Sequence, residues 1–125
     1  MSQATRKKIL LVDDSGTILM MEKMILAREP YDVVTAKDGK EAVEKAASEQ
    51  PDLILLDVVM PQLTGFEVLQ KLRSQEATKA TPVILVTTRG EAANVEAGYA
   101  EGCSDYVTKP INSAELLAKI HNYLD

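Results

Sequence analysis

Cysteine, tryptophan and long apolar runs are scarce or absent in this chain of 125 residues. The single cysteine, Cys103, excludes an internal disulfide and is typical of a reducing compartment. The polar segment 1–8 precedes an apolar run of only four residues, which is too short for a signal peptide or a membrane span. We therefore expect a cytoplasmic protein that has no membrane partner.

Positive charge is also in deficit, because 14 Lys and Arg residues face 19 Asp and Glu residues and give a formal net charge of −5. A nucleic-acid-binding domain normally carries a basic stripe, so we expect no nucleic-acid partner. The length suits one domain over residues 1–125, of which 1–7 are expected to form a disordered N-terminal extension. No linker or output segment follows this core, which predicts a stand-alone domain.

Strand-like and helix-like segments alternate five times along the chain. Apolar or β-branched runs predict strands at 9–13, 32–36, 53–57, 83–87 and 104–107. Helices are predicted at 17–28, 40–49, 65–74, 91–100 and 114–124, with apolar stripes such as Ile18, Met21 and Ile25. This alternation predicts an α/β fold in which a doubly wound parallel sheet has helices on both faces.

Three carboxylates end two of the predicted strands. Asp13 and Asp14 close the first apolar run, and Asp57 closes the third. Ligands of open α/β sheets bind at the carboxyl ends of the strands, so we expect these acids around one point. Two such charges about 4 Å apart repel by about 4 kcal/mol at an effective dielectric of 20, and Mg²⁺, which prefers oxygen ligands, would relieve that repulsion.

Two further polar residues end strands at the same predicted edge. Lys109 follows the fifth strand, and Thr87 ends the fourth. A lone lysine there is usually a solvated surface charge, and a strand threonine is usually only a good β-former. Beside three carboxylates and a cation, however, the ammonium and the hydroxyl could each hold an anionic phosphoryl oxygen.

These residues resemble the receiver domain of bacterial two-component response regulators over essentially the whole chain. The resemblance is strongest with the stand-alone receivers typified by the bacterial chemotaxis regulator, and it implies a flavodoxin-like sheet of order 2-1-3-4-5 with five helices. It is carried by VDDS at 12–15, LDVVMP at 56–61 followed by Gly65, PVILVT at 82–87 and YVTKP at 106–110.

The resemblance implies a role for each residue of the acidic motifs. Asp57 would be the phosphoacceptor, and it would bind Mg²⁺ together with Asp14 and the backbone carbonyl of Val59. Asp13 would act on the same metal mostly through bound water. The donor would be a phosphohistidine on a histidine kinase or a histidine phosphotransfer protein, and the chain would act as a signalling phosphoprotein rather than as an enzyme on other substrates.

Further roles follow for the residues of the later motifs. Thr87 and Lys109 would hold phosphoryl oxygens, and Tyr106 would turn inward as Thr87 moves. The output surface would be the fourth helix, the fifth strand and the fifth helix, and its target would be a protein in chemotaxis or motility. We expect a monomer, with a dimer formed only on phosphorylation.

Three positions depart from the family's common pattern. Val59 and Arg89 occupy variable positions at which the family tunes hydrolysis of the phospho-aspartate. An apolar Val59 and a long Arg89 predict a phosphorylated form that lives longer than that of fast chemotaxis regulators. Thr88 stands where a small residue is common, and its branched side chain is expected to restrict access to the site.

Three other functions compete with this interpretation. A flavin carrier would share the topology, but Asp13 and Asp14 would repel its phosphate, and a chain with no Trp and one Phe has little to stack on a flavin. A phosphatase of the phospho-aspartate type would usually carry a second Asp at the position of Val59. A pseudo-receiver, which would bind partners without phosphorylation, stays open as the alternative.

Overall fold

The central element of the fold is a five-stranded parallel sheet. The computed structural model describes residues 6–58, 64–88 and 102–124, and the strand order is β2-β1-β3-β4-β5. Every neighbouring pair is parallel, which confirms the predicted sheet and its order. The strands are β1 (Lys7–Val12), β2 (Tyr31–Ala36), β3 (Leu53–Asp57), β4 (Val83–Thr88) and β5 (Asp105–Lys109).

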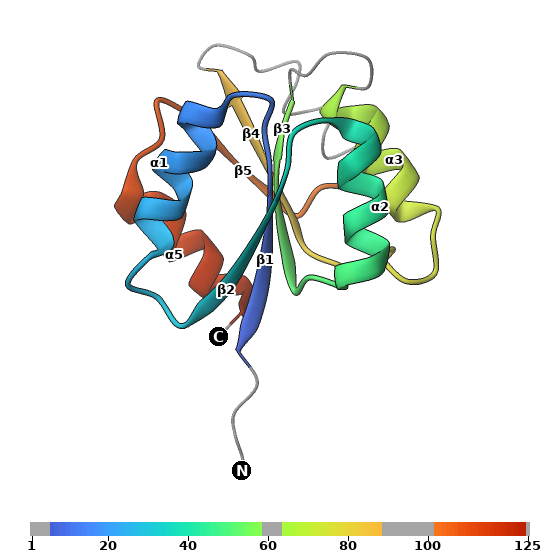
Figure 1. Cartoon of the computed structure of the whole chain (residues 1–125), viewed down its shortest axis with the longest axis horizontal. Helices are drawn as coiled ribbons and strands as arrows, with labels where there is room; N and C mark the ends of the chain where they lie inside the picture. The colour runs from blue at the N-terminus through green and yellow to red at the C-terminus, as the bar shows by residue number, and fades with distance from the viewer. Residues whose placement is uncertain (1–5, 59–63, 89–101, 125) are drawn as a thin grey trace.

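Helices cover both faces of the sheet (Figure 1). The described residues contain α1 (Gly16–Leu26), α2 (Gly39–Glu49), α3 (Gly65–Arg73) and α5 (Ser113–Leu124). Helices α1 and α5 lie on one face, and α2 and α3 lie on the other. The helix predicted at 91–100 lies outside the described residues.

Two apolar cores separate the helices from the sheet, because successive strand residues point to opposite faces. In β1, Leu10 and Val12 contact the α2–α3 layer, whereas Ile9 and Leu11 contact the α1–α5 layer. The central strands β1 and β3 are buried almost throughout, as expected of strands that are covered on both sides. This packing fixes which strand ends meet at the carboxyl edge of the sheet.

Polar caps fix where the helices begin. The Ser15 hydroxyl accepts a hydrogen bond from the Ile18 amide at the start of α1, and Thr64 and Glu67 form a reciprocal capping box at the start of α3. Helix α1 starts one residue before its prediction, and its buried face is formed by Leu19, Glu22 and Leu26. The apolar stripe of Ile18, Met21 and Ile25 is only partly buried, and it lies beside this buried face.

Two features at the chain's edges complete the fold. Strand β1 begins at Lys7, so that residue belongs to the sheet rather than to the predicted extension, and the Arg6 guanidinium pairs with the Asp32 carboxylate. The peptide bond between Lys109 and Pro110 is cis. Among the described helices, none combines the length and the apolar character that crossing a membrane requires.

Candidate functional site

Three aspartates meet at the carboxyl edge of the sheet. Asp13, Asp14 and Asp57 each offer a carboxylate oxygen, and these oxygens all lie within 4.8 Å of one another. Asp13 and Asp57 are buried, whereas Asp14 is exposed at the rim. The cluster therefore has a closed inner wall and an open side, which is the arrangement that the strand ends predicted.

Backbone hydrogen bonds hold the two buried aspartates in place. The Asp13 amide donates to the carbonyl of Ala36 in β2, and the Asp13 Oδ1 atom accepts the Ser15 amide at 2.9 Å. Asp57 is the last residue of β3, and the next amide, that of Val58, donates to the carbonyl of Val86. Because neighbouring strands fix both segments, the carboxylates have little freedom to move apart.

Lys109 supplies a positive charge to this cluster. Its Nζ atom lies 3.3 Å from Asp57 Oδ1 and 3.4 Å from Asp13 Oδ2. Burial lowers the pKa of the Lys109 ammonium, but the charges and hydrogen bonds of Asp57 and Asp13 together outweigh it, so the pKa is raised. Lys109 is therefore a permanent cation within reach of an anion bound at Asp57.

Thr87 presents a buried hydroxyl at the same edge. It lies in β4 directly after Val86, the residue that pairs with Asp57, and only 3% of Thr87 is exposed. Its Oγ1 atom has no hydrogen-bond partner among the described residues. A buried hydroxyl without a partner is unfavourable, and an anionic oxygen bound at the cluster would give it one.

A glycine lets helix α3 start directly against the end of β3, which carries Asp57. A Cβ atom on Gly65 would lie 2.4 Å from the carbonyl oxygen of Asp57 and 2.8 Å from the Cα atom of Val58. The Gly65 amide also donates to the Val58 carbonyl at 2.9 Å. Any side chain at this position would push the helix away from the strand end that carries Asp57.

Tyr106 lies in β5 with its ring partly buried against the α2–α3 core. Its amide donates to the Asp105 carboxylate, which pairs with the Lys119 ammonium at 2.8 Å. The same ammonium lies 5.3 Å from the centroid of the Tyr106 ring, a distance typical of a cation–π contact. Asp105 and Lys119, which sequence reasoning did not single out, therefore surround the predicted switch residue.

A fourth acidic side chain lies below the cluster. Glu22 is 1% exposed, and its Oε1 atom has no hydrogen-bond partner among the described residues. Burial and the charges of Asp13 and Asp57 raise its pKa to about 8, although Lys109 acts in the opposite direction. The signal in the sequence was its spacing, because Glu22 lies between Leu19 and Leu26 on one helical face.

The remaining predicted site residues are less completely defined. Thr88 ends β4 and pairs with Lys109 in the sheet register, which places its backbone at the site. Val59 and Arg89 lie outside the described residues. The donor set that is described consists of carboxylate oxygens, which is the chemistry that Mg²⁺ prefers.

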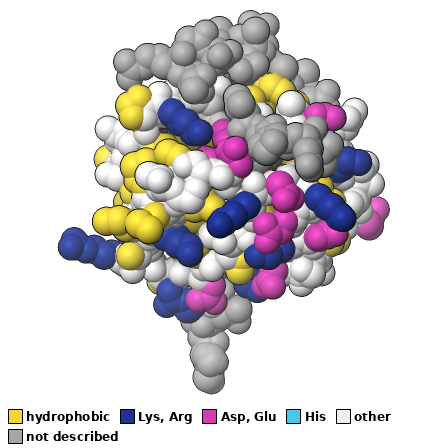
Figure 2. Space-filling view, turned by 45° about the horizontal axis from the view of Figure 1, so that its top comes forward, with side chains coloured by type: hydrophobic (Ala, Val, Ile, Leu, Met, Phe, Trp, Pro, Cys, Tyr) yellow, Lys and Arg dark blue, Asp and Glu magenta, His cyan; other side chains and the backbone are white. Residues whose placement is uncertain are grey.

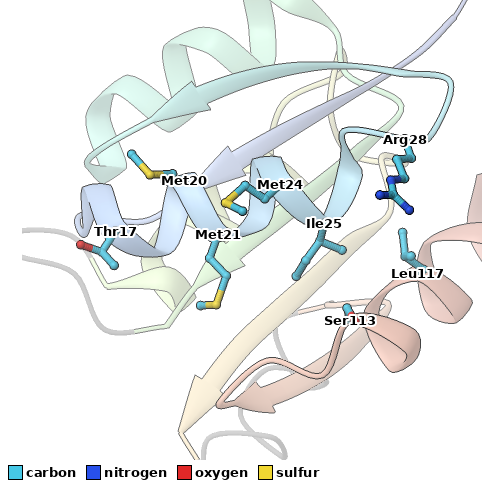
Figure 3. Close-up of a pocket in the computed structure, with 8 residues that line it drawn as sticks. All are labelled: Thr17, Met20, Met21, Met24, Ile25, Arg28, Ser113 and Leu117. Carbon is cyan, nitrogen blue, oxygen red and sulfur yellow. The ribbon is translucent and has the colours of Figure 1, made fainter.

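A groove on the side of the molecule is separate from the acid cluster. Its walls come from α1 and from the start of α5, as Figure 3 shows. In the space-filling view, hydrophobic side chains gather on the α1 side, whereas acidic side chains gather towards α2 (Figure 2). The groove is lined by Thr17, Met20, Met21, Met24, Ile25, Arg28, Ser113 and Leu117.

Comparison with known proteins agrees with this geometry. The family model of the response regulator receiver domain matches residues 9–121. The chain is 43% identical over 114 residues to the alkaline phosphatase synthesis transcriptional regulatory protein PhoP of Bacillus subtilis. That match covers 91% of this chain and 47% of PhoP, so the chain spans about half the length of this relative.

Solved structures share the same fold. The chemotaxis protein CheY4 of Vibrio cholerae superposes with a TM-score of 0.90 and 38% identity, over 96% of this chain and 100% of that chain. The receiver domain of a sensor histidine kinase from Pseudomonas aeruginosa PAO1 has a TM-score of 0.87 and 29% identity, over 95% and 98% of the two chains. Its structure holds a magnesium ion coordinated in the active-site cleft.

Proposed function

This chain belongs to the response regulator receiver domain family, and on that basis we propose that it accepts a phosphoryl group on Asp57 from a phosphohistidine. The observation that carries the proposal is the convergence of Asp13, Asp14 and Asp57 with Lys109 and with the Thr87 hydroxyl, which has no hydrogen-bond partner among the described residues. A receiver domain is a signalling domain, so the product of the transfer is a changed protein surface. We propose that residues 1–125 form one such domain.

The acid cluster fits a magnesium ion. Asp13, Asp14 and Asp57, with the backbone carbonyl of Val59, would hold it, and the bound ion would neutralise negative charge on the reacting phosphoryl group. Three carboxylates carry a charge of −3, and Mg²⁺ with Lys109 would supply +3. A neutral site does not repel an incoming phosphoryl group, whereas the carboxylates alone would.

The chain's own residues supply positioning and charge. The Asp57 carboxylate oxygen attacks the phosphorus atom, the bond from phosphorus to the histidine nitrogen breaks, and the imidazole leaves with its electron pair. Lys109, already 3.3 Å from Asp57 Oδ1, follows the transferred group as a point charge. The Thr87 hydroxyl donates to another phosphoryl oxygen and so gains a hydrogen-bond partner that the described residues do not supply.

The same contacts drive the conformational switch. Phosphorylation converts the Asp57 carboxylate into a group of nearly two negative charges, towards which Thr87 moves. The space left by Thr87 lets Tyr106 turn inward, which alters a surface formed by the predicted helix at 91–100, β5 and α5. That surface binds a protein target, and the protein is a monomer until phosphorylation permits a dimer.

Three residues tune the lifetime of the phosphorylated form. Val59 and Arg89 hinder the water that would hydrolyse the acyl phosphate, and Thr88 restricts which donors reach Asp57. We expect Val59→Asn to shorten the lifetime, measured as the loss of phosphoryl mass after the donor is removed. A wild-type lifetime of seconds that Val59→Asn does not change would contradict this role.

The partner is a histidine kinase or a histidine phosphotransfer protein in a cytoplasmic phosphorelay. CheY4 of Vibrio cholerae, which this chain covers over its full length, is a chemotaxis protein, and this supports a role in chemotaxis or motility. The relative PhoP is a transcriptional regulator of about twice the length. Transfer tests with purified kinases would identify the donor.

Intact mass spectrometry tests the proposal directly. The protein is incubated with Mg²⁺ and a small acyl phosphate, and we expect a gain of one phosphoryl mass that Asp57→Asn abolishes. Asp32→Asn is the matched control, because Asp32 is an exposed aspartate that pairs with Arg6. Omitting Mg²⁺ should also abolish the gain.

A second donor distinguishes a protein that accepts no phosphoryl group from one whose site the small donor cannot reach. If no mass is gained with the small donor, a phosphorylated histidine kinase is used, since Thr88 is expected to restrict small donors. No gain with either donor would reject phosphotransfer and favour the pseudo-receiver alternative. A gain that Asp57→Asn leaves unchanged would reject Asp57 as the acceptor.

A further inference from the structure

A carboxyl group lies in the apolar layer between α1 and the sheet, below the acid cluster. Glu22 shares its helix face with Leu19 and Leu26, both of which are buried. Packing alone would favour a third apolar residue here, because a buried carboxyl without a hydrogen-bond partner is unfavourable. The packing of the described residues therefore does not explain why a carboxyl group is buried here.

The charged groups that act on Glu22 all belong to the candidate site. They are Asp13, Lys109 and Asp57, in order of decreasing influence. The Asp13 Oδ2 atom is also buried, and its contact with the Lys109 ammonium, at 3.4 Å, is a long one. Glu22 and Asp13, which interact electrostatically, thus each have a buried oxygen with no well-formed hydrogen bond among the described residues.

We propose that Glu22 is a positioning residue that holds the pair formed by Asp13 and Lys109 in place beside Asp57. A hydrogen bond from Glu22, direct or through one buried water, would limit the positions that the Asp13 carboxylate adopts. Asp13 in turn anchors the ammonium that must meet the phosphoryl group, and small displacements of such groups slow a reaction strongly. The proposal rests on the proposed function for its effect on phosphorylation, but not for the effect of Glu22 on Lys109.

This role needs a donor and an acceptor rather than a negative charge. Glutamine has both in nearly the same shape, whereas leucine has neither. Glu22→Gln should therefore keep Lys109 in place, and Glu22→Leu should release it. Lys23→Leu is the matched control, because it adds the same apolar side chain to the next, exposed position of the same helix.

Two measurements test the role. The first is the rate at which an amine-acylating reagent modifies Lys109 in the metal-free protein, relative to the exposed Lys79, read by peptide mass spectrometry. The second is the initial rate of phosphorylation by a small acyl phosphate with Mg²⁺. For Glu22→Leu we expect Lys109 to be modified about tenfold faster and phosphorylation to be about tenfold slower, with Glu22→Gln and Lys23→Leu close to wild type.

Each outcome decides the proposal. Wild-type rates in Glu22→Leu would overturn it, and so would a Glu22→Gln protein as impaired as Glu22→Leu, since the carboxyl would then act through charge alone. If the wild type takes up no phosphoryl group, the proposed function fails, yet the acylation rate of Lys109 still decides whether Glu22 holds the pair. Glu22→Met replaces Glu22→Leu if circular dichroism shows that the latter is unfolded.

Discussion

The two helical layers cover the same sheet with different kinds of side chain. The residues that α2 and α3 bury are glycine, alanine, valine and leucine without exception. Helix α1, by contrast, buries Glu22 between two leucines and leaves Met20 and Met24 exposed to 64% and 70%. The buried faces of α2 and α3 are therefore wholly apolar, whereas the buried face of α1 gives up stability at Glu22, beside the acid cluster.

The largest loss of stability should come from a substitution in the α2–α3 layer. Leu69 of α3 is fully buried, so Leu69→Ala should lower the free energy of unfolding by about 4 kcal/mol through lost burial and the cavity it leaves. Urea unfolding followed by circular dichroism measures the change. Leu117→Ala in α5 is the matched control, and its half-buried position predicts a loss of about 1 kcal/mol. Equal losses for the two substitutions would show that the loss does not follow burial.

A smaller effect should come from pH, through Glu22. Its pKa is about 8 in the folded protein against 4.5 for an ordinary glutamate, so the folded state holds this proton more tightly. The stability that this proton provides is complete below pH 4.5 and is lost as the pH rises towards 8. At pH 7 the loss is about 3 kcal/mol, from about 1.4 kcal/mol for each pH unit above 4.5.

Glu22→Gln should remove this part of the pH dependence. Urea unfolding from pH 5 to pH 8, with a chelator present, should give a flatter profile for the variant than for the wild type. Glu41→Gln is the control, because Glu41 is a partly exposed glutamate whose pKa is lowered rather than raised, chiefly by its hydrogen bond with the Lys37 amide. Parallel profiles of wild type and Glu22→Gln would show that Glu22 is ionised in the folded protein at neutral pH.

Much of the buried sheet and of the acid cluster was predictable from the sequence. Continuous runs of Ile, Leu and Val identify β1, β3 and β4 because strands buried on both faces tolerate little else. The convergence of Asp13 and Asp57 follows from parallel strands, whose carboxyl ends share one edge. The strand order came from the family resemblance, since residue patterns do not specify which strands are neighbours.

The α1–α5 layer was less predictable for a physical reason. An acidic residue in a helix usually faces solvent, so Glu22 was not expected on the buried face of α1, and the apolar stripe singled out in that helix was Ile18, Met21 and Ile25. The buried face includes Leu19 and Leu26. The helical period alone does not distinguish this face from the adjacent one, because tertiary contacts decide which of the two is buried. The pairing of Lys119 with Asp105 beside Tyr106 likewise joins α5 to β5 and has no local signal.

The smallest effect should come from the exposed methionines of α1. Met24 is 70% exposed, so Met24→Gln removes little buried surface and keeps a good helix former at that position. We expect the free energy of unfolding to change by less than about 0.5 kcal/mol, against about 4 kcal/mol for Leu69→Ala. The measurement is urea unfolding under the same conditions. A loss above about 1 kcal/mol would mean that Met24 is buried in solution, for example against a second copy of the chain, and a dependence of that loss on protein concentration would identify such a contact. A negligible change would show that this apolar side chain contributes nothing to folding, in contrast to the leucines of α3.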